Sequence, residues 1–204
     1  MLEPHTSEEQ PINADPDQAL MLQYARGNTR AFELLYSKHK GPLYRYFVRQ
    51  IYDQQLAEDL YQETWSRVIK AASKYQAKAK FTTWLYRIAH NIIIDHVRAK
   101  KPESSFTDTF EAGQDSESIA SCLSESPEQQ LQQQKKALLL KDCVNDLPPV
   151  QQEAFLLNME MGFTAATIAD IAGATIEATK SRLRYANKGL KACVDLKWQE
   201  VGYD

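Results

Sequence analysis

Apolar residues recur at helical spacing along most of the chain, whereas the signals for strands are weak throughout. Amphipathic helices are expected over about residues 31–47, 56–72 and 81–100. Gly41 and Pro42 interrupt the first of these, so we expect a kink or turn there. The third carries apolar residues on both sides, which favours a central place in a helical bundle. The pattern predicts an all-α fold.

The C-terminal part alternates short helices and glycine turns. Pro148 and Pro149 suit the first turn of a helix that ends near Gly162, and a second short helix ends near Gly173. Thr175 can cap a third helix, which is basic. This order is typical of a helix-turn-helix unit, whose last helix lies in the major groove of DNA. A solvated basic helix on a helical bundle is the alternative interpretation.

Changes of composition divide the chain into four parts. Residues 1–19 are acidic, contain three prolines and have little apolar content, so we expect a mobile tail. Residues 20–101 are expected to form a first helical domain. Residues 102–127 are rich in Ser, Asp, Glu and Gly, which predicts a flexible acidic linker. Residues 128–198 are expected to form a second helical domain that contains the helix-turn-helix unit.

The net charge of −3 gives no global indication of a nucleic-acid partner, but the charge is unevenly distributed. Residues 20–101 hold 15 Lys and Arg against 6 Asp and Glu, a net charge of +9, whereas residues 102–146 have a net charge of −6. A local excess of this size is enough to attract a polyanion. An ordinary lysine-rich surface is the alternative.

An acidic face interrupts this basic domain. Asp59, Gln62 and Ser66 lie on the outer side of the second predicted helix, with Glu63 on its flank. The face is either simply solvated or a docking surface for a basic partner. Asp95 falls near the apolar stripe of the third helix and needs a partner that the sequence does not identify.

Cations surround aromatic residues just before the third helix. Lys74, Tyr75, Lys78 and Lys80 follow one another closely, and Trp84 comes one turn later. Rings that stack on bases and cations that hold phosphates suit a single-stranded nucleic acid. Core packing is the favoured explanation for Trp84, whereas for Tyr75 both explanations stay open.

Histidines and glycines give no sign of catalysis. His5, His39, His90 and His96 have no nucleophile or ligand cluster at a useful spacing. There is no phosphate-binding glycine loop. We therefore expect no enzymatic activity, no catalytic residues, no metal and no cofactor.

The cysteines and the absence of long apolar runs indicate a cytoplasmic protein. Cys122, Cys143 and Cys193 are odd in number and widely spaced, which argues against a disulfide framework and fits a reducing compartment. No transmembrane run and no positively charged leader is visible, so membrane insertion is not expected.

Two blocks of sequence resemble conserved parts of bacterial RNA polymerase sigma factors. Residues 57–65 (Ala-Glu-Asp-Leu-Tyr-Gln-Glu-Thr-Trp), residues 81–91 (Phe-Thr-Thr-Trp-Leu-Tyr-Arg-Ile-Ala-His-Asn) and Asp95-His-Val-Arg98 resemble region 2. The segment from Leu147-Pro-Pro to Lys180-Ser-Arg-Leu-Arg184 resembles region 4. With only these regions and a short linker, the chain resembles the small extracytoplasmic-function (ECF) group of the sigma-70 family.

The resemblance implies a sigma factor that binds core RNA polymerase, directs it to specific promoters and helps to melt them. Core RNA polymerase, promoter DNA (duplex and single strand) and an anti-sigma factor are the implied partners. The implied polymerase-binding residues are Asp59, Gln62 and Glu63. The implied contacts to the minus-ten strand are Lys74, Tyr75, Lys80, Trp84, Arg87, Asn91 and Arg98. The implied contacts to the minus-thirty-five duplex are Lys180, Ser181, Arg182, Arg184 and Lys188.

The main alternative is a helix-turn-helix transcriptional regulator whose upstream helical domain senses a signal or binds a partner. Such a regulator would bind duplex DNA tightly and sequence-specifically by itself. A sigma factor needs the polymerase, so the two hypotheses are separable by experiment.

Overall fold

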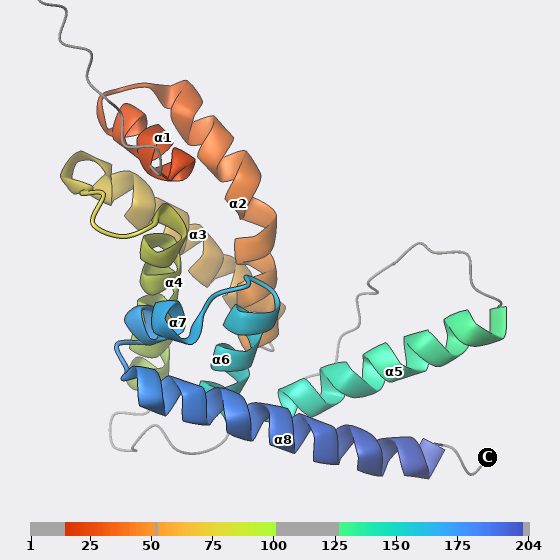
Figure 1. Ribbon diagram of the computed structural model, residues 1–204. Coiled ribbons are helices and arrows are strands. Elements are labelled where there is room, and N and C mark those ends of the chain that lie inside the picture. The colour runs from red at the N-terminus through yellow and green to blue at the C-terminus, as the bar shows by residue number, and fades with distance from the viewer. Residues whose placement is uncertain (1–14, 52, 101–126, 202–204) are drawn as a thin grey trace, which may run out of the picture.

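The computed structural model describes residues 15–51, 53–100 and 127–201, and within these ranges all regular structure is helical (Figure 1). The elements are α1 (Pro16–Ala25), α2 (Thr29–Gln50), α3 (Gln54–Ala71), the 3-10 turn η1 (Ala72–Lys74), α4 (Phe81–Lys100), α5 (Pro127–Asn145), α6 (Pro149–Met159), α7 (Ala165–Ala172) and α8 (Ile176–Val201). None of the described helices is long and apolar enough to cross a membrane. The expectation of an all-α fold is confirmed.

Helices α1 to α4 pack around an apolar core, and polar side chains fix where they begin. Asn28 accepts a hydrogen bond from the Ala31 amide at 3.4 Å, and Asp53 accepts one from the Leu56 amide at 3.1 Å. These N-caps satisfy amides that have no partner inside the helix. The core they enclose contains the fully buried side chains Met21, Leu35, Leu43, Phe47, Val68, Phe81, Leu85 and Ile92.

Helix α2 runs unbroken past Pro42, so the turn expected at Gly41 and Pro42 does not occur. Proline removes one backbone hydrogen bond from a helix interior. Leu35 and Leu43, which lie before and after the break in the sequence pattern, are both fully buried. Tertiary packing along the whole length of α2 outweighs the local signal of the proline.

Residues 16–19, which the composition placed in a mobile tail, are part of α1. Pro16 begins this helix, and Asp17 is buried with 3% of its surface exposed. The physical reason is that Asp17 pairs with Lys38 and His39 of α2, which the sequence could not show. The rest of the tail, residues 1–14, and most of the predicted linker, residues 101–126, lie outside the described residues.

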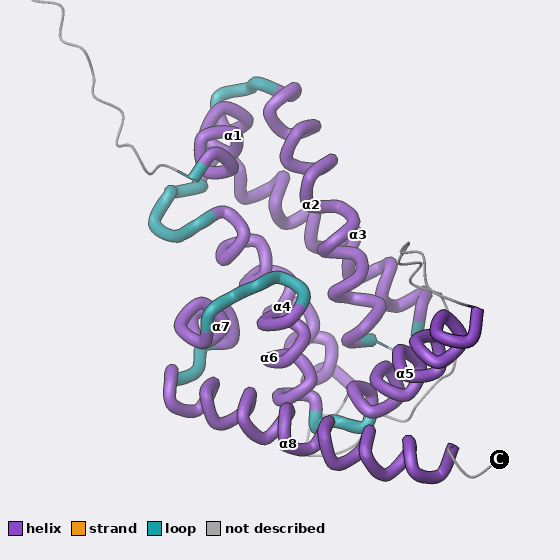
Figure 2. Tube along the Cα trace, turned by 45° about the vertical axis from the view of Figure 1, so that its right-hand side comes forward, coloured by secondary structure: helices purple, strands orange, loops and turns teal. Residues whose placement is uncertain are grey.

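Helix α4 takes the central place predicted for it. It packs on α3 on one side and on α7 on the other (Figure 2). Its residue Ile92 is 1% exposed, while Ile88 and Ile93 pack against the same core. Apolar residues on both sides of α4 are thus explained by neighbours on both sides.

The helix-turn-helix unit forms as the glycines and threonines predict. Gly162 and Gly173 adopt left-handed conformations, with φ of 64° and 60°. Thr164 caps α7 by accepting from the Thr167 amide at 3.2 Å, and Thr175 caps α8 by accepting from the Ala178 amide at 3.1 Å. These turns and caps set the short α7 between α6 and the long basic α8.

Helices α5 and α8 meet near the C-terminal end of α5 and diverge from there (Figure 1). A disulfide joins Cys143 of α5 to Cys193 of α8. The expectation that no disulfide forms was wrong. The two cysteines are 50 residues apart, but the pairing of α5 with α8 brings their Cα atoms to 5.8 Å. A second small core surrounds the bond, with Val144, Leu147 and Leu190 buried there.

We predict that the disulfide stabilises the C-terminal helices. Replacing both cysteines, as Cys143→Ser with Cys193→Ser, is expected to lower the free energy of unfolding by about 2–4 kcal/mol, because the unfolded chain regains the freedom of a closed loop. Denaturant unfolding followed by circular dichroism measures the change.

The matched control for this prediction is Cys122→Ser, which leaves both bonded cysteines in place. Reductant should destabilise the wild type and the control but not the double variant. Equal stability of all three proteins with and without reductant would contradict the prediction.

Candidate nucleic-acid interface

The residues of the acidic face predicted on α3 are solvent-exposed. Asp59, Gln62 and Glu63 lie on the side of α3 opposite its buried residues. Glu63 accepts a hydrogen bond from Arg67 Nε at 2.9 Å. Arg67 also lies 3.5 Å from the carboxylate of Asp95, which therefore has the partner that the sequence did not identify. The three side chains are held by neighbours on one helix and remain open to a partner.

The loop before α4 combines exposed cations with a buried ring. Lys74, Lys78 and Lys80 are exposed, but Tyr75 is only 8% exposed, so its ring is part of the core. It packs edge-on against Trp84 at a centroid distance of 4.9 Å. Trp84 is half-buried, in agreement with the expectation of core packing.

A pocket of about 280 Å³ opens beside this aromatic pair. Its walls include Lys74, Tyr75, Lys78, Thr83 and Trp84. Within the described residues the Tyr75 hydroxyl has no hydrogen-bond partner. Burial, together with the nearby charges of Asp15 and Asp17, raises the pKa of Tyr75 to about 12, so the hydroxyl stays protonated. The pocket therefore has an aromatic wall and a rim of lysines.

The side of α4 that carries Arg87 and Asn91 faces α7. Arg87 donates to the backbone carbonyl of Asp170 at 2.8 Å and also pairs with its carboxylate. Arg87 and Asn91 line a groove of about 480 Å³ together with the turn between α7 and α8. Arg98, near the end of α4, is exposed.

A buried polar cluster joins α6 to the upstream bundle. Glu153 accepts from the hydroxyl of Tyr46 at 2.7 Å and contacts His90 Nδ1 at 2.7 Å. The side chains of Glu153 and His90 are 13% and 12% exposed. Burial and the charge of Glu153 raise the pKa of Tyr46, so its hydroxyl remains a donor.

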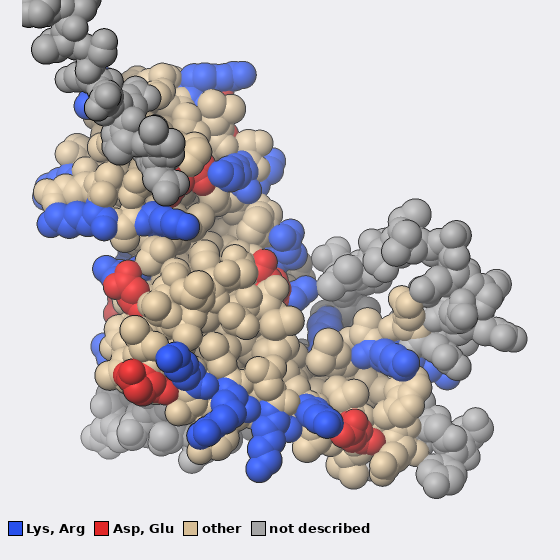
Figure 3. Space-filling model, in the orientation of Figure 1, with Lys and Arg blue, Asp and Glu red and all other residues tan. Residues whose placement is uncertain are grey.

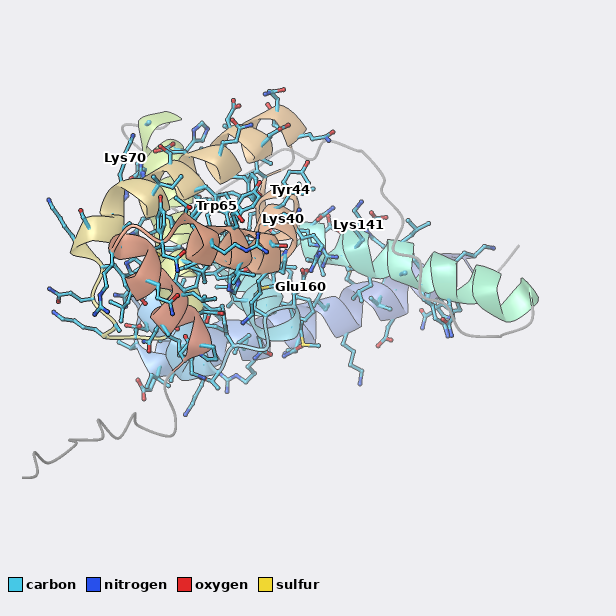
Figure 4. The ribbon with its side chains drawn as sticks, turned by 90° about the horizontal axis from the view of Figure 1, so that it is seen from above. Lys40, Tyr44, Trp65, Lys70, Lys141 and Glu160 are labelled. Carbon is cyan, nitrogen blue, oxygen red and sulfur yellow. A yellow bond between two sulfur atoms is a disulfide. The ribbon has the colours of Figure 1, made fainter. Side chains whose placement is uncertain are left out.

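A second ion pair lies at the edge of the same contact. Glu160, which follows the last residue of α6, is labelled in Figure 4. It pairs with Arg49 of α2. Neither Glu153 nor Glu160 could be predicted from the sequence, because their partners His90 and Arg49 lie 63 and 111 residues away. No local pattern signals such contacts.

Cations gather along the outer side of α8 (Figure 3). Lys180, Arg184 and Lys188 are exposed, while Ser181 and Arg182 are half-buried. Within the part of the chain that the structure describes, none of these cations forms an ion pair. The outer side of the last helix therefore offers unneutralised donors.

The family model for sigma-70 region 2 matches residues 35–103. The RNA polymerase sigma-H factor of Pseudomonas aeruginosa is 27% identical over 186 residues, which cover 88% of this chain and 94% of that protein. The ECF RNA polymerase sigma factor SigC of Mycobacterium tuberculosis is 29% identical over 180 residues, which cover 85% of this chain and 89% of that protein. The chain belongs to the ECF group of the sigma-70 family.

Two solved structures share the fold of this sigma factor. CnrH in complex with the cytosolic domain of CnrY gives a TM-score of 0.63 at 21% identity, covering 89% of this chain and 99% of that chain. The sigma factor RpoE in complex with the anti-sigma factor NepR from Bartonella quintana gives 0.61 at 23% identity, covering 80% and 96%. These likenesses support the helical architecture described above.

The residues assigned to the minus-ten strand differ in accessibility in this sigma factor. Lys74, Lys80 and Arg98 are open to solvent, and Trp84 lines the pocket. Arg87 and Asn91 are also exposed, but they line a groove together with residues of α7, and Arg87 is engaged by Asp170. The C-terminal unit thus occupies part of the surface that the sequence assigned to DNA.

We predict that Glu153 holds the C-terminal unit on the bundle. The substitution Glu153→Ala leaves Tyr46 and His90 without their shared acceptor, and is expected to lower the free energy of unfolding by about 1–3 kcal/mol. Denaturant unfolding measures the change.

Glu153→Gln is the matched variant, because its amide oxygen can still accept from Tyr46, and it should lose less stability. A Glu153→Ala protein as stable as the wild type would show that the cluster contributes nothing.

Proposed function

We propose that this sigma factor binds core RNA polymerase in the cytoplasm, directs it to promoters and helps to melt them. The observation that carries the proposal is the presence, in one chain of the sigma-70 family, of two separate candidate DNA-reading surfaces. One is the unneutralised outer side of α8, and the other is the basic, aromatic-walled pocket before α4.

The helix α8 is proposed to read the minus-thirty-five duplex. Lys180, Arg184 and Lys188 are spaced by four residues, so they follow one edge of the helix. Ser181 and Arg182 lie beside them. Arginine donates in a fork to guanine in the major groove, and lysine neutralises phosphates. The exposed side of α8 has the residue types that this contact requires.

The loop before α4 is proposed to capture the minus-ten strand. Its pocket is lined by the half-buried Trp84, by Tyr75 with 8% of its surface exposed, and by Lys74 and Lys78. Lys80 is exposed in the same loop. Stacking on aromatic rings holds an unpaired base, and flanking cations hold its phosphates. Arg87, Asn91 and Arg98 would extend the contact along α4.

The exposed acidic side of α3 is proposed to bind the polymerase. This side of α3, which carries Asp59, Gln62 and Glu63, is negatively charged although the domain as a whole is positively charged. A local negative charge suits a basic surface on a partner. We further propose that residues 20–101 and 128–198 are the two functional domains, that residues 102–127 link them, and that an anti-sigma factor is a further partner.

Promoter binding is proposed to require separation of α7 from α4. Arg87 donates to the backbone carbonyl of Asp170 and pairs with its carboxylate, so these contacts compete with a contact to a DNA strand. Ile168 and Ile171 of α7 belong to the same buried core as the upstream bundle. Separation exposes this apolar surface to water, which costs about 25 cal/mol of free energy for each Å² exposed. Binding to the polymerase and to both promoter elements would have to offset that cost.

The test of the proposed function is run-off transcription with purified core polymerase from promoter-containing genomic fragments. The sigma factor should produce discrete transcripts that core polymerase alone does not. Absence of stimulated transcripts from any fragment, together with tight sequence-specific duplex binding by the free protein, would support the regulator alternative instead.

Single substitutions should separate the two activities. Arg184→Ala is expected to weaken use of minus-thirty-five elements by about 5- to 150-fold, because one base contact contributes about 1–3 kcal/mol. Asp59→Ala is expected to weaken binding to core polymerase about tenfold. Run-off transcription and fluorescence titration with labelled polymerase measure the two effects.

Charge-matched controls are Lys135→Ala on α5 and Glu33→Ala on α2, both at exposed positions outside the proposed contacts. Neither should change either activity by more than about twofold, the scale of an exposed charge. Equal loss of both activities in Arg184→Ala and Asp59→Ala would contradict the assignment.

A further inference from the structure

The carboxylate of Asp15 joins the beginnings of two helices. Its Oδ1 accepts from the Asp17 amide at 3.1 Å and caps α1, while its Oδ2 accepts from the Phe81 amide at 2.9 Å. Phe81 is the first residue of α4, 66 residues along the chain. Amides at a helix start have no partner inside the helix, and a negative charge is favourable there. A single side chain therefore fixes where α4 begins relative to α1.

The next turn of α1 holds the loop itself. Gln18 Nε2 donates to the backbone carbonyl of Ala79 at 2.5 Å. Ala79 lines the pocket walled by Tyr75 and Trp84. The contacts of Asp15 and Gln18 thus attach both ends of the short segment 79–81 to α1.

Helix α1 is itself fixed firmly enough to serve as a reference. Asp17 is buried and accepts from Lys38 Nζ at 2.8 Å, while His39 Nε2 lies 2.8 Å from the same carboxylate. The ring of His39 lies against that of Phe81, with centroids 5.3 Å apart. A buried carboxylate with two cationic or donor partners is costly to displace. Any shift of α1 would move His39, Phe81 and the loop together.

We propose that Asp15 and Gln18 are positioning residues for the minus-ten pocket. They fix the backbone at Ala79, which lines the pocket, and at Phe81, where α4 begins. The pocket thereby keeps the width that an unpaired base requires. This inference rests on the proposed function. Neither side chain needs to touch DNA, because both act through the backbone of residues 79–81.

The experiment is transcription by the reconstituted holoenzyme from a template library with a randomised promoter region, followed by sequencing of the transcripts. The variants are Asp15→Ala and Gln18→Ala. Each should reduce the base preference at minus-ten positions by about three- to tenfold, the range set by one lost hydrogen bond. Preferences at minus-thirty-five positions and binding to core polymerase should stay unchanged.

Two further variants separate positioning from folding. Asp15→Asn keeps only one side-chain oxygen, so it can accept from the Asp17 amide or from the Phe81 amide but not from both, and it should restore only part of the preference. Asp53→Ala removes the cap of α3, which Asp53 forms with Leu56 away from the loop. It should lower thermal stability without changing the minus-ten preference.

The outcomes distinguish the two proposals. A wild-type holoenzyme that gives no promoter-specific transcripts overturns the proposed function. A wild type with a clear minus-ten preference that Asp15→Ala and Gln18→Ala leave intact overturns the positioning role. A preference that falls in Asp53→Ala as much as in Asp15→Ala also overturns it, because the effect then follows stability alone.

Discussion

Helix α4 carries apolar side chains on two sides, and both sides have to be buried against other helices. The arrangement of the other helices follows from this requirement. On one side the upstream bundle provides the cover, with Phe81, Leu85 and Ile92 buried in its core. On the other side α7 provides it, so the helix-turn-helix unit folds back onto the domain from which a long segment separates it in sequence (Figure 2). The polar cluster at Glu153 then joins α6 to Tyr46 of α2 and to His90 of α4.

This packing brings two candidate DNA-reading surfaces into one compact body. The outer side of α8 stays open, whereas part of the α4 surface lies under α7. In this packing the cations of α8 that are proposed to read duplex DNA are exposed, while Arg87 of α4 is engaged by Asp170. Polymerase contacts on α3 would leave that packing intact, since Asp59 and Glu63 lie on the outer side of the bundle.

Local signals predicted most of the fold, and distant contacts explain the rest. Caps such as Thr175 and turns such as Gly173 act within four residues, so the helix-turn-helix unit was predictable. The burial of Tyr75, the disulfide of Cys143 and the partners of Glu153 depend on residues far away in sequence. The charges that mark candidate surfaces could be found by pattern, but their accessibility could not.

The proposed function depends most on the separation of α7 from α4 when the sigma factor acts. The direct measurement is the distance between fluorophores at Lys70→Cys on α3 and Lys191→Cys on α8, in a Cys122→Ser background with the native disulfide intact. We expect a short distance in the free protein and a clearly longer one in the promoter-bound holoenzyme. An unchanged distance in a holoenzyme that initiates transcription would contradict the proposed separation.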